Sequence, residues 1–329
     1  MKIAFFSTKS YDKIYFEKYR AQSKHLFTYF EAFLSESTIN LTIDFDGICV
    51  FVNDKVDRKT IENLAKNGIK LIALRCAGFN NVDLVAAHEF GIKVVRVPAY
   101  SPEAVAEHAV ALILTLNRKT HKVYNRVRES NFSLENLIGF NLYGKTVGVI
   151  GTGQIGTAFS KIMIGFGCKV IGYDIIQSEE LLSQGFEYQP MNKVLKNADI
   201  ISLHCPLSPE TQHLFDKKAF AKMKKGAMLI NTSRGGLINT PDAIDALKNR
   251  SLGQLGIDVY EQEGNLFFKD LSESIIQDDV IQRLMSFPNV LITPHQGFFT
   301  DEALTQIAIT TIKNITDFEK KVTLINEVK

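Results

Sequence analysis

The sequence predicts an α/β protein built from two doubly wound, parallel-sheet domains. Its 329 residues exceed what one hydrophobic core usually organises, so two domains are expected. Short runs of β-branched and aliphatic residues alternate with helix-like segments along almost the whole chain, which is typical of parallel strands joined by crossover helices. The alternation occurs as two series, separated by a long helix-like segment that begins near residue 102.

The first series predicts an N-terminal sheet from four strand-like runs, "KIAFF" (2–6), "GICVFV" (47–52), "IKLIALR" (69–75) and "IKVVRV" (92–97). It ends at "PAYSPEAVAEHAVALILTLNRK". There Ser101 can cap a helix, Pro102 suits the first helical turn, and Glu103 complements the helix dipole. A long helix is therefore expected to begin at this point.

The second series predicts a complete doubly wound unit in the middle of the chain. Its six strand candidates are "KTVGVI" (145–150), "KVIGYD" (169–174), "DIISLH" (199–204), "AMLINT" (227–232), "LGIDVY" (255–260) and "NVLITP" (289–294). The C-terminal segment then predicts one more helix, with Thr300 as its cap and Asp301 and Glu302 in its first turn. One helix cannot form a domain, so we expect it to pack on the N-terminal series.

Composition argues against several classes of function. The chain is 45% hydrophobic and 22% charged, and its net charge of +2 offers no field that would favour nucleic acid or an acidic membrane. The N-terminal apolar run is too short for a signal peptide, and no stretch is long enough to span a bilayer. The four cysteines stand far apart without a CxxC pair, so neither a metal site nor a disulfide framework is expected, and a cytoplasmic location fits best.

The segment "VGVIGTGQIG" carries a dinucleotide-binding signature. Gly151, Gly153 and Gly156 have GxGxxG spacing, directly after a predicted strand and before a predicted helix. These glycines permit a tight turn, close approach of the backbone to a pyrophosphate, and close packing of helix on strand. The N–H groups that begin the helix can then bind the phosphates. The signature predicts a Rossmann domain.

Asp174 predicts which dinucleotide is bound. It ends the next strand, about 20 residues downstream, where an acidic side chain accepts hydrogen bonds from the adenosine ribose. The same carboxylate would repel a 2′-phosphate, so NAD is expected rather than NADP.

Polar side chains follow three successive strands of this predicted domain. Ser233 and Arg234 follow the fourth strand, Glu261 and Glu263 follow the fifth, and His295 follows the sixth. Ligands of open α/β sheets bind outside the carboxyl ends of the strands, so these side chains are expected at one rim beside the cofactor.

The rim residues suit reduction of a 2-keto acid. Arg234 can hold a carboxylate and a carbonyl through its planar fork, and His295 can protonate the carbonyl oxygen. A glutamate beside the histidine would orient its ring, but the sequence alone leaves Glu261 and Glu263 as alternatives. Among the other histidines, we interpret His108 as a buried helical residue and His204 as lining the cofactor site, whereas no chemical context is evident for His25, His88, His121 or His213.

The chain resembles the D-2-hydroxyacid dehydrogenase family over essentially its whole length, and most closely that family's fermentative, NAD-dependent D-lactate dehydrogenases. The motifs that carry the resemblance are "LRCAGFNNVDL", "VPAYSPEAVAEHA", "GKTVGVIGTGQIG", "SLHCPL", "NTSRGGLI", "GIDVYEQE" and "TPHQGFFTDEA", in the family's order. It implies a flavodoxin-like catalytic domain from residues 1–99 and 298–329, a Rossmann NAD-binding domain from residues 100–297, and a cleft between them.

The resemblance also implies roles for individual residues. Arg234 would bind and polarise the substrate, Glu263 would pair with the catalytic histidine, and His295 would be the acid/base. The other implied substrate contacts are Cys76, Ala77, Gly78, Tyr100 and Phe298. The implied cofactor contacts are Gly151, Gly153, Gln154, Ile155, Gly156, Asp174, Cys205, Pro206, Thr211, Thr232, Ser233, Arg234 and Asp258.

The expected reaction is reduction of pyruvate to D-lactate with NADH, regenerating NAD during fermentation. Phe298 and Phe299 would suit the small methyl group of pyruvate, and the long segment after Glu263 is similar to the lactate dehydrogenase branch. Two alternatives stay open: a sibling enzyme for bulkier 2-keto acids such as 2-ketoisocaproate, and a non-catalytic NAD-sensing protein of the same fold. The resemblance further implies a homodimer or homotetramer.

Overall fold

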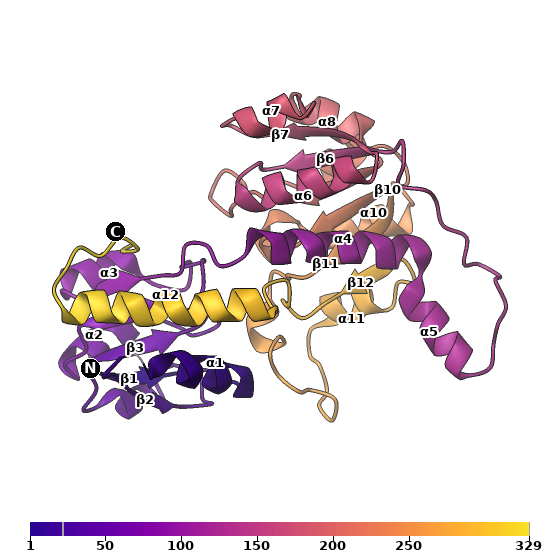
Figure 1. Cartoon of the computed structure of the whole chain (residues 1–329). Helices are drawn as coiled ribbons and strands as arrows, with labels where there is room; N and C mark the ends of the chain where they lie inside the picture. Colours follow the sequence, from indigo (N-terminus) through magenta and orange to yellow (C-terminus); the bar gives the residue numbers. More distant parts are fainter. Residues whose placement is uncertain (22, 329) are drawn as a thin grey trace. The chain divides into compact units, whose positions relative to one another are not determined.

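The computed structural model describes residues 1–21 and 23–328. The chain divides into two compact units, one formed by Met1–Ser101 with Phe298–Lys329 and the other by Pro102–Gly297. Each unit contains its own parallel sheet flanked by helices (Figure 1). The predicted α/β class with two parallel-sheet domains is confirmed.

The first unit contains, in its described part, a five-stranded sheet in the order β2-β1-β3-β4-β5. Every pair is parallel. This is the flavodoxin-like strand order. The strands are β1 (Lys2–Phe5), β2 (Leu26–Tyr29), β3 (Gly47–Val50), β4 (Leu71–Leu74) and β5 (Lys93–Val95).

Helices cover both faces of this sheet. A buried apolar cluster packs one face against η1 (Ile39–Thr42), α2 (Arg58–Lys66) and α3 (Leu84–Glu89). On the other face, α1 (Ser10–Arg20) sets Phe16 against Phe5, and α12 (Asp301–Glu319) packs on α1 and β4. Thr300 caps α12, since its hydroxyl accepts from the Ala303 N–H at 3.2 Å, as predicted.

The second unit contains, among its described residues, a seven-stranded sheet in the order β12-β11-β10-β9-β6-β7-β8. All of these pairs are also parallel. The order reverses between β6 and β9, which is the switch point of a Rossmann sheet, with one further strand at the edge. The strands are β6 (Thr146–Ile150), β7 (Lys169–Tyr173), β8 (Glu187–Tyr188), β9 (Ile200–Leu203), β10 (Ala227–Asn231), β11 (Leu252–Ile257) and β12 (Val290–Ile292).

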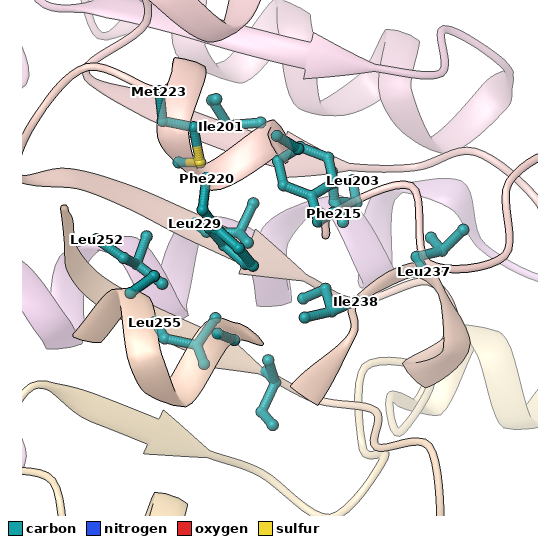
Figure 2. Close-up of a cluster of buried hydrophobic side chains, with 14 of the residues drawn as sticks. Ile201, Leu203, Phe215, Phe220, Met223, Leu229, Leu237, Ile238, Leu252 and Leu255 are labelled. Atoms are coloured by element: carbon teal, nitrogen blue, oxygen red, sulfur yellow. The ribbon is translucent and has the colours of Figure 1, made fainter. Parts of the chain in front are cut away.

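Two apolar clusters cover the faces of this sheet. One packs it against α4 (Pro102–Arg118), α6 (Gln154–Gly165) and α7 (Glu179–Ser183). The other, shown in Figure 2, packs it against α8 (Met191–Asn197), α9 (Lys217–Lys222), α10 (Thr240–Lys248) and α11 (Asp279–Met285). Leu203 and Ile257, the last residues of β9 and β11, are buried in this second cluster, so the loops that follow them start from packed positions.

Two strands lie outside the runs that the sequence singled out. The strand β2 reads "LFTY" with alternating exposed and half-buried residues, and β8 has only two residues. Both are edge strands, which bury less apolar surface than central strands and so give a weaker sequence pattern. In the described residues, we find no helix that is both long enough and apolar enough to cross a bilayer.

Candidate active site

The sheet register aligns the strands that precede the predicted rim residues. Asn231 of β10 pairs with Ile257 of β11, which pairs with Ile292 of β12. Arg234 and His295 therefore each follow this row by three residues. Parallel strands end at the same edge of a sheet, so the turns that carry both side chains start side by side within the second unit.

The Arg234 turn is fixed by hydrogen bonds and by the core. The buried Asn231 side chain donates to the Arg234 carbonyl at 2.8 Å and accepts from the Ser233 N–H at 3.0 Å. Leu237 and Ile238, which follow the turn, are buried in the cluster of Figure 2. The guanidinium is partly buried and donates to the Ser233 carbonyl at 2.7 Å. The backbone of Arg234 is thus held in place from both sides of the turn.

His295 pairs with Glu263 rather than with Glu261. Its Nδ1 lies 2.8 Å from Glu263 Oε1, and the second oxygen of Glu263 accepts from the Tyr260 N–H at 3.0 Å. Glu261 instead contacts His213 and Thr240. Both members of the His295–Glu263 pair are largely buried, and the ring of Phe268 lies 5.9 Å from the imidazole.

The turn that carries His295 is built around the Asp258 carboxylate. His295 has φ = +57°, a left-handed conformation that is unusual for a residue with a side chain. Asp258, 1% exposed, accepts from the Gln296 and Gly297 N–H groups, both at 2.8 Å. It also accepts from the Thr293 hydroxyl at 2.6 Å. These bonds hold the strained turn that presents His295.

His108 completes this network from helix α4. Its Nε2 lies 3.0 Å from Thr293 Oγ1 and 3.2 Å from Asp258 Oδ1. Burial alone would raise the pKa of Asp258, but the hydrogen bonds from His108 and Thr293 and the nearby imidazole charges lower it overall. Asp258 is therefore held as an anion, and His108 has a partner that the sequence did not reveal.

The three glycines of the dinucleotide signature meet three different environments. Gly151 has φ = +93°, and a Cβ there would lie 2.5 Å from the Cys205 nitrogen. A Cβ on Gly156 would lie 2.0 Å from the Gly151 carbonyl oxygen. A Cβ on Gly153, the N-cap of α6, would meet open space, which leaves room for a ligand above the free N–H groups of Gln154 and Ile155.

Asp174 is held beside this loop. Its Oδ2 accepts from the Thr152 N–H at 2.5 Å and from the Thr152 hydroxyl at 3.1 Å, and its Oδ1 accepts from the Ile176 N–H at 3.1 Å. The hydroxyl of Tyr188 lies 2.8 Å from Thr152 Oγ1. The carboxylate that would meet the ribose is thus preorganised by the glycine loop itself.

The loops after β9 and β10 line the switch point. The Ser233 hydroxyl donates to the Cys205 carbonyl at 2.6 Å, which joins the two loops. Thr211 donates to the Pro206 carbonyl and so shapes its own loop. Thr232 Oγ1 is buried and has no hydrogen-bond partner among the described residues. An orphaned buried hydroxyl at this place fits a partner supplied by a dinucleotide.

The remaining predicted substrate residues lie in the first unit. Cys76, Ala77 and Gly78 follow the carboxyl end of β4, where Cys76 Sγ contacts the Gly78 carbonyl at 3.3 Å. Arg96 donates to the Ala77 carbonyl at 2.7 Å. Phe298 packs against Tyr100, Phe51 and Phe299, with ring centroids 6.4, 5.7 and 6.0 Å away.

Two histidines have side-chain partners that the sequence interpretation did not include. His213, which had no evident context, contacts Glu261 at 2.5 Å. The imidazole of His204, which was interpreted as lining the cofactor site, lies between Ser202, at 2.9 Å, and the ring of Phe159, with ring centroids 4.9 Å apart. Desolvation lowers the pKa of His204 to about 3, so it is neutral. No local sequence signal distinguishes either environment.

Among the described residues, no three histidine, cysteine or acidic side chains are grouped as metal ligands would be. The cysteines at 49, 76, 168 and 205 are all present as free thiols.

Comparisons with known proteins support this fold. Residues 110–297 match the family described as "D-isomer specific 2-hydroxyacid dehydrogenase, NAD binding domain". The D-lactate dehydrogenase of Escherichia coli is 52% identical over 327 residues, covering 99% of each chain.

Solved structures agree over the full length. The apo-structure of D-lactate dehydrogenase from Escherichia coli superposes with a TM-score of 0.92 at 49% identity, covering 100% of both chains. The pyruvate reductase of Chlamydomonas reinhardtii superposes with a TM-score of 0.94 at 46% identity, covering 99% of this chain and 98% of that one. A D-2-hydroxyisocaproate dehydrogenase is less similar, with a TM-score of 0.86 at 32% identity and coverage of 100% and 99%.

Proposed function

The chain belongs to the family of D-isomer-specific 2-hydroxyacid dehydrogenases, and from this premise we propose that it reduces pyruvate to D-lactate with NADH. The family's members are NAD-dependent oxidoreductases, so the predicted cofactor and enzyme class are confirmed at the level of the family. The observation that carries the specific reaction is the His295–Glu263 pair, which is buried at the same sheet edge as Arg234.

NAD fits the residues at the switch point. The proposal assigns its pyrophosphate to the open side of Gly153 and the N–H groups of Gln154 and Ile155, and its ribose to Asp174. Other contacts are assigned to Gly151, Gly156, Cys205, Pro206, Thr211, Thr232, Ser233, Arg234 and Asp258. When bound, NADH supplies the hydride that reduces the keto carbon.

Arg234 would orient the substrate. A guanidinium presents two parallel N–H donors, which match a carboxylate and the neighbouring keto oxygen of a 2-keto acid. One Nη already donates to the Ser233 carbonyl, and this bond would fix the plane of the fork. Orientation of this kind reduces the entropy that the reaction must otherwise lose.

His295 would donate the proton and Glu263 would orient it. Because Nδ1 is bound to Glu263 Oε1, Nε2 is the nitrogen available to the keto oxygen. The protonated imidazole donates from Nε2 as the carbonyl is reduced, and accepts that proton back during lactate oxidation. A carboxylate beside the imidazolium would balance its positive charge, so the pair would carry little net charge in its partly buried surroundings.

In the first unit, the proposal assigns the substrate carboxylate to the backbone of Cys76, Ala77 and Gly78 and a hydroxyl contact to Tyr100. Phe298, which is buried among aromatic rings, would limit the space for the substrate's side chain. This aromatic environment favours a substrate whose side chain is a methyl group over one whose side chain is branched. We therefore propose the first unit as the catalytic domain (residues 1–99 and 298–329) and residues 100–297 as the NAD-binding domain.

A substrate panel tests the proposal. NADH oxidation would be followed with pyruvate, 2-ketobutyrate and 2-ketoisocaproate, and the pyruvate product would be resolved on a chiral column. The expected result is the highest kcat/KM with pyruvate and a product that is D-lactate. Preference for 2-ketoisocaproate would indicate the sibling enzyme, and NADH binding without turnover of any 2-keto acid would indicate a non-catalytic NAD-sensing protein.

We also propose a cytoplasmic homo-oligomer, either a dimer or a tetramer. Helix α5 (Thr120–Arg128) and the segment after it extend away from the sheet of the second unit (Figure 1). This segment exposes Phe132, Leu134, Ile138 and Tyr143, with Ile138 89% exposed. A projecting run of apolar side chains suits burial against a second copy. Sedimentation of the wild type and of an Ile138→Asp variant tests it: the variant should dissociate, and an unchanged mass would contradict this interface.

A further inference from the structure

A second imidazole–carboxylate pair lies two residues from the proposed catalytic glutamate. His213 Nε2 contacts Glu261 Oε1 at 2.5 Å, with side chains that are 37% and 23% exposed. The proposed reaction uses neither residue. The pair joins the loop after β9 to the segment after β11.

Glu261 is held from its other side as well. Its Oε2 accepts from the Thr240 hydroxyl at 2.9 Å and from the Thr240 N–H at 3.3 Å. Thr240 is the first residue of helix α10, so the carboxylate also lies at the positive end of a helix. Through Thr240, Glu261 therefore also binds the segment after β10, which carries Arg234. Three segments, after β9, β10 and β11, are joined in this way.

His213 touches the Arg234 turn through its backbone too. Its N–H donates to the Gly236 carbonyl at 2.8 Å, and its φ is +52°, a left-handed conformation that needs support from its surroundings. The side-chain bond to Glu261 and the backbone bond to Gly236 provide that support from two sides.

The Arg234 turn and the Glu263 segment also meet backbone to backbone. A Cβ on Gly235 would lie 2.1 Å from the Tyr260 carbonyl carbon and 2.3 Å from the Glu261 nitrogen. Such a contact is close but has no directional bond of its own. The side chain of Glu261, which belongs to this contact, bonds to both His213 and Thr240. These bonds fix how the two segments are aligned at the contact.

We propose that His213 and Glu261 are a positioning pair that locks the Arg234 turn to the segment carrying Glu263. The inference rests on the proposed function, because it concerns the alignment of Arg234 with the His295–Glu263 pair. Neither residue touches the substrate. Loosening the lock lets Arg234 shift relative to the imidazole, which weakens substrate binding and slows proton transfer together.

Steady-state kinetics test the positioning role, with whichever 2-keto acid the wild type reduces fastest. For His213→Ala, the KM for the keto acid should rise and kcat should fall, each by about 3- to 30-fold. His213→Gln, whose amide can still donate to Glu261, should recover most of the loss. The double variant His213→Ala with Glu261→Ala should be no worse than Glu261→Ala alone, since that variant already removes the bond to His213 together with the bonds to Thr240.

A matched control separates positioning from general stability. Lys161 and Glu180 form an ion pair of the same 2.5 Å length on the exposed surface of the same unit. Lys161→Ala should leave every kinetic constant unchanged. If His213→Ala does not fold, Thr240→Val provides the test instead, because it keeps the side-chain shape and removes one bond to Glu261.

Hydrogen exchange gives a readout that does not depend on activity. In His213→Ala, amides of residues 232–240 and 258–266 should exchange faster than in the wild type and in Lys161→Ala. Wild-type KM and kcat in His213→Ala, additive single variants, or a lower melting temperature with unchanged exchange and KM would each overturn the proposal. A wild type that reduces no 2-keto acid defeats the proposed function, and the exchange comparison then still decides whether the lock exists.

Discussion

The Nδ1 atom of His295 lies 2.8 Å from Oε1 of Glu263, although the backbone of His295 has a left-handed φ of +57°. The conformation is held by Asp258, which accepts from the N–H groups of the two residues after His295. Backbone strain maintained by buried hydrogen bonds is typical of functional positions, because the surroundings must stabilise it. We therefore infer that Glu263 and the strained turn together orient the imidazole of His295 and its Nε2 atom.

Glu263→Gln should lower kcat without preventing folding. The amide can still accept from Nδ1, so the ring keeps its orientation, but the protonated imidazole loses its neighbouring anion. We expect kcat to fall about 10-fold for Glu263→Gln and about 10²- to 10³-fold for Glu263→Ala, which loses orientation as well. Stopped-flow NADH oxidation measures both. Equal losses in the two variants would mean that the charge alone matters.

Arg234→Lys should damage both binding and turnover. A lysine ammonium is a point charge that cannot hold two oxygens and the Ser233 carbonyl in one plane. We expect kcat/KM for pyruvate to fall about 100-fold, with a higher KM and a lower kcat. Arg283→Lys, on the exposed face of α11, is the control. Wild-type kinetics in Arg234→Lys would refute the two-pronged clamp.

Two substitutions in the glycine loop should separate an effect on NADH binding from an effect on folding. Gly153→Ala places a methyl in open space above the start of α6, so the fold should tolerate it while NADH affinity falls about 10-fold or more. Gly156→Ala drives a methyl to 2.0 Å from the Gly151 carbonyl oxygen and should destabilise the unit. Fluorescence titration with NADH and thermal unfolding would be measured on both. The assignment fails if Gly153→Ala binds NADH as the wild type does.

Asp174 should control the choice between NADH and NADPH. Asp174→Ser removes the carboxylate that would repel a 2′-phosphate, and Ile175→Arg, at a position 87% exposed, supplies a cation for it. The double variant should shift the ratio of kcat/KM for NADPH over NADH upward by about 100-fold. Ile175→Arg alone should shift it far less, because Asp174 remains. An unchanged ratio in the double variant would exclude Asp174 as the ribose ligand.

Sequence reasoning succeeded where the determinants are local. The glycine spacing, Asp174 at the end of its strand and the Thr300 cap all depend on residues that are close in the chain, and the structure forms each of these features. The shared location of the rim residues could be predicted because parallel strands end at one edge of a sheet. This rule needs only the order of the elements along the chain. The choice between Glu261 and Glu263 could be made only by analogy until their partners were seen.

The features that sequence reasoning missed are long-range or marginal. The Asp258–Thr293–His108 network joins three elements up to 185 residues apart, and no spacing rule predicts such a meeting. The edge strands β2 and β8 bury too little apolar surface to stand out. Side-chain partners of single histidines, such as Glu261 for His213, depend on tertiary packing that the pattern of one sequence does not encode.

His204 should make the stability of the protein depend on pH. Its imidazole is desolvated against Phe159, which lowers its pKa from 6.5 to about 3. The unfolded chain takes up a proton near pH 6.5, whereas the folded protein does not. The stability from this residue is therefore fully present above about pH 6.5 and is lost progressively as the pH falls toward about 3.

His204→Gln tests this linkage, because glutamine does not titrate and can still bond to Ser202. Between about pH 7 and about pH 5, the wild type should lose about 2 kcal/mol of its free energy of unfolding through His204 alone. Urea unfolding at both pH values should show that this part of the loss disappears in His204→Gln and persists in His88→Gln, which changes an exposed histidine of α3. The same pH slope in all three proteins would mean that His204 is protonated in the folded state, and that solvent reaches the base of the glycine loop.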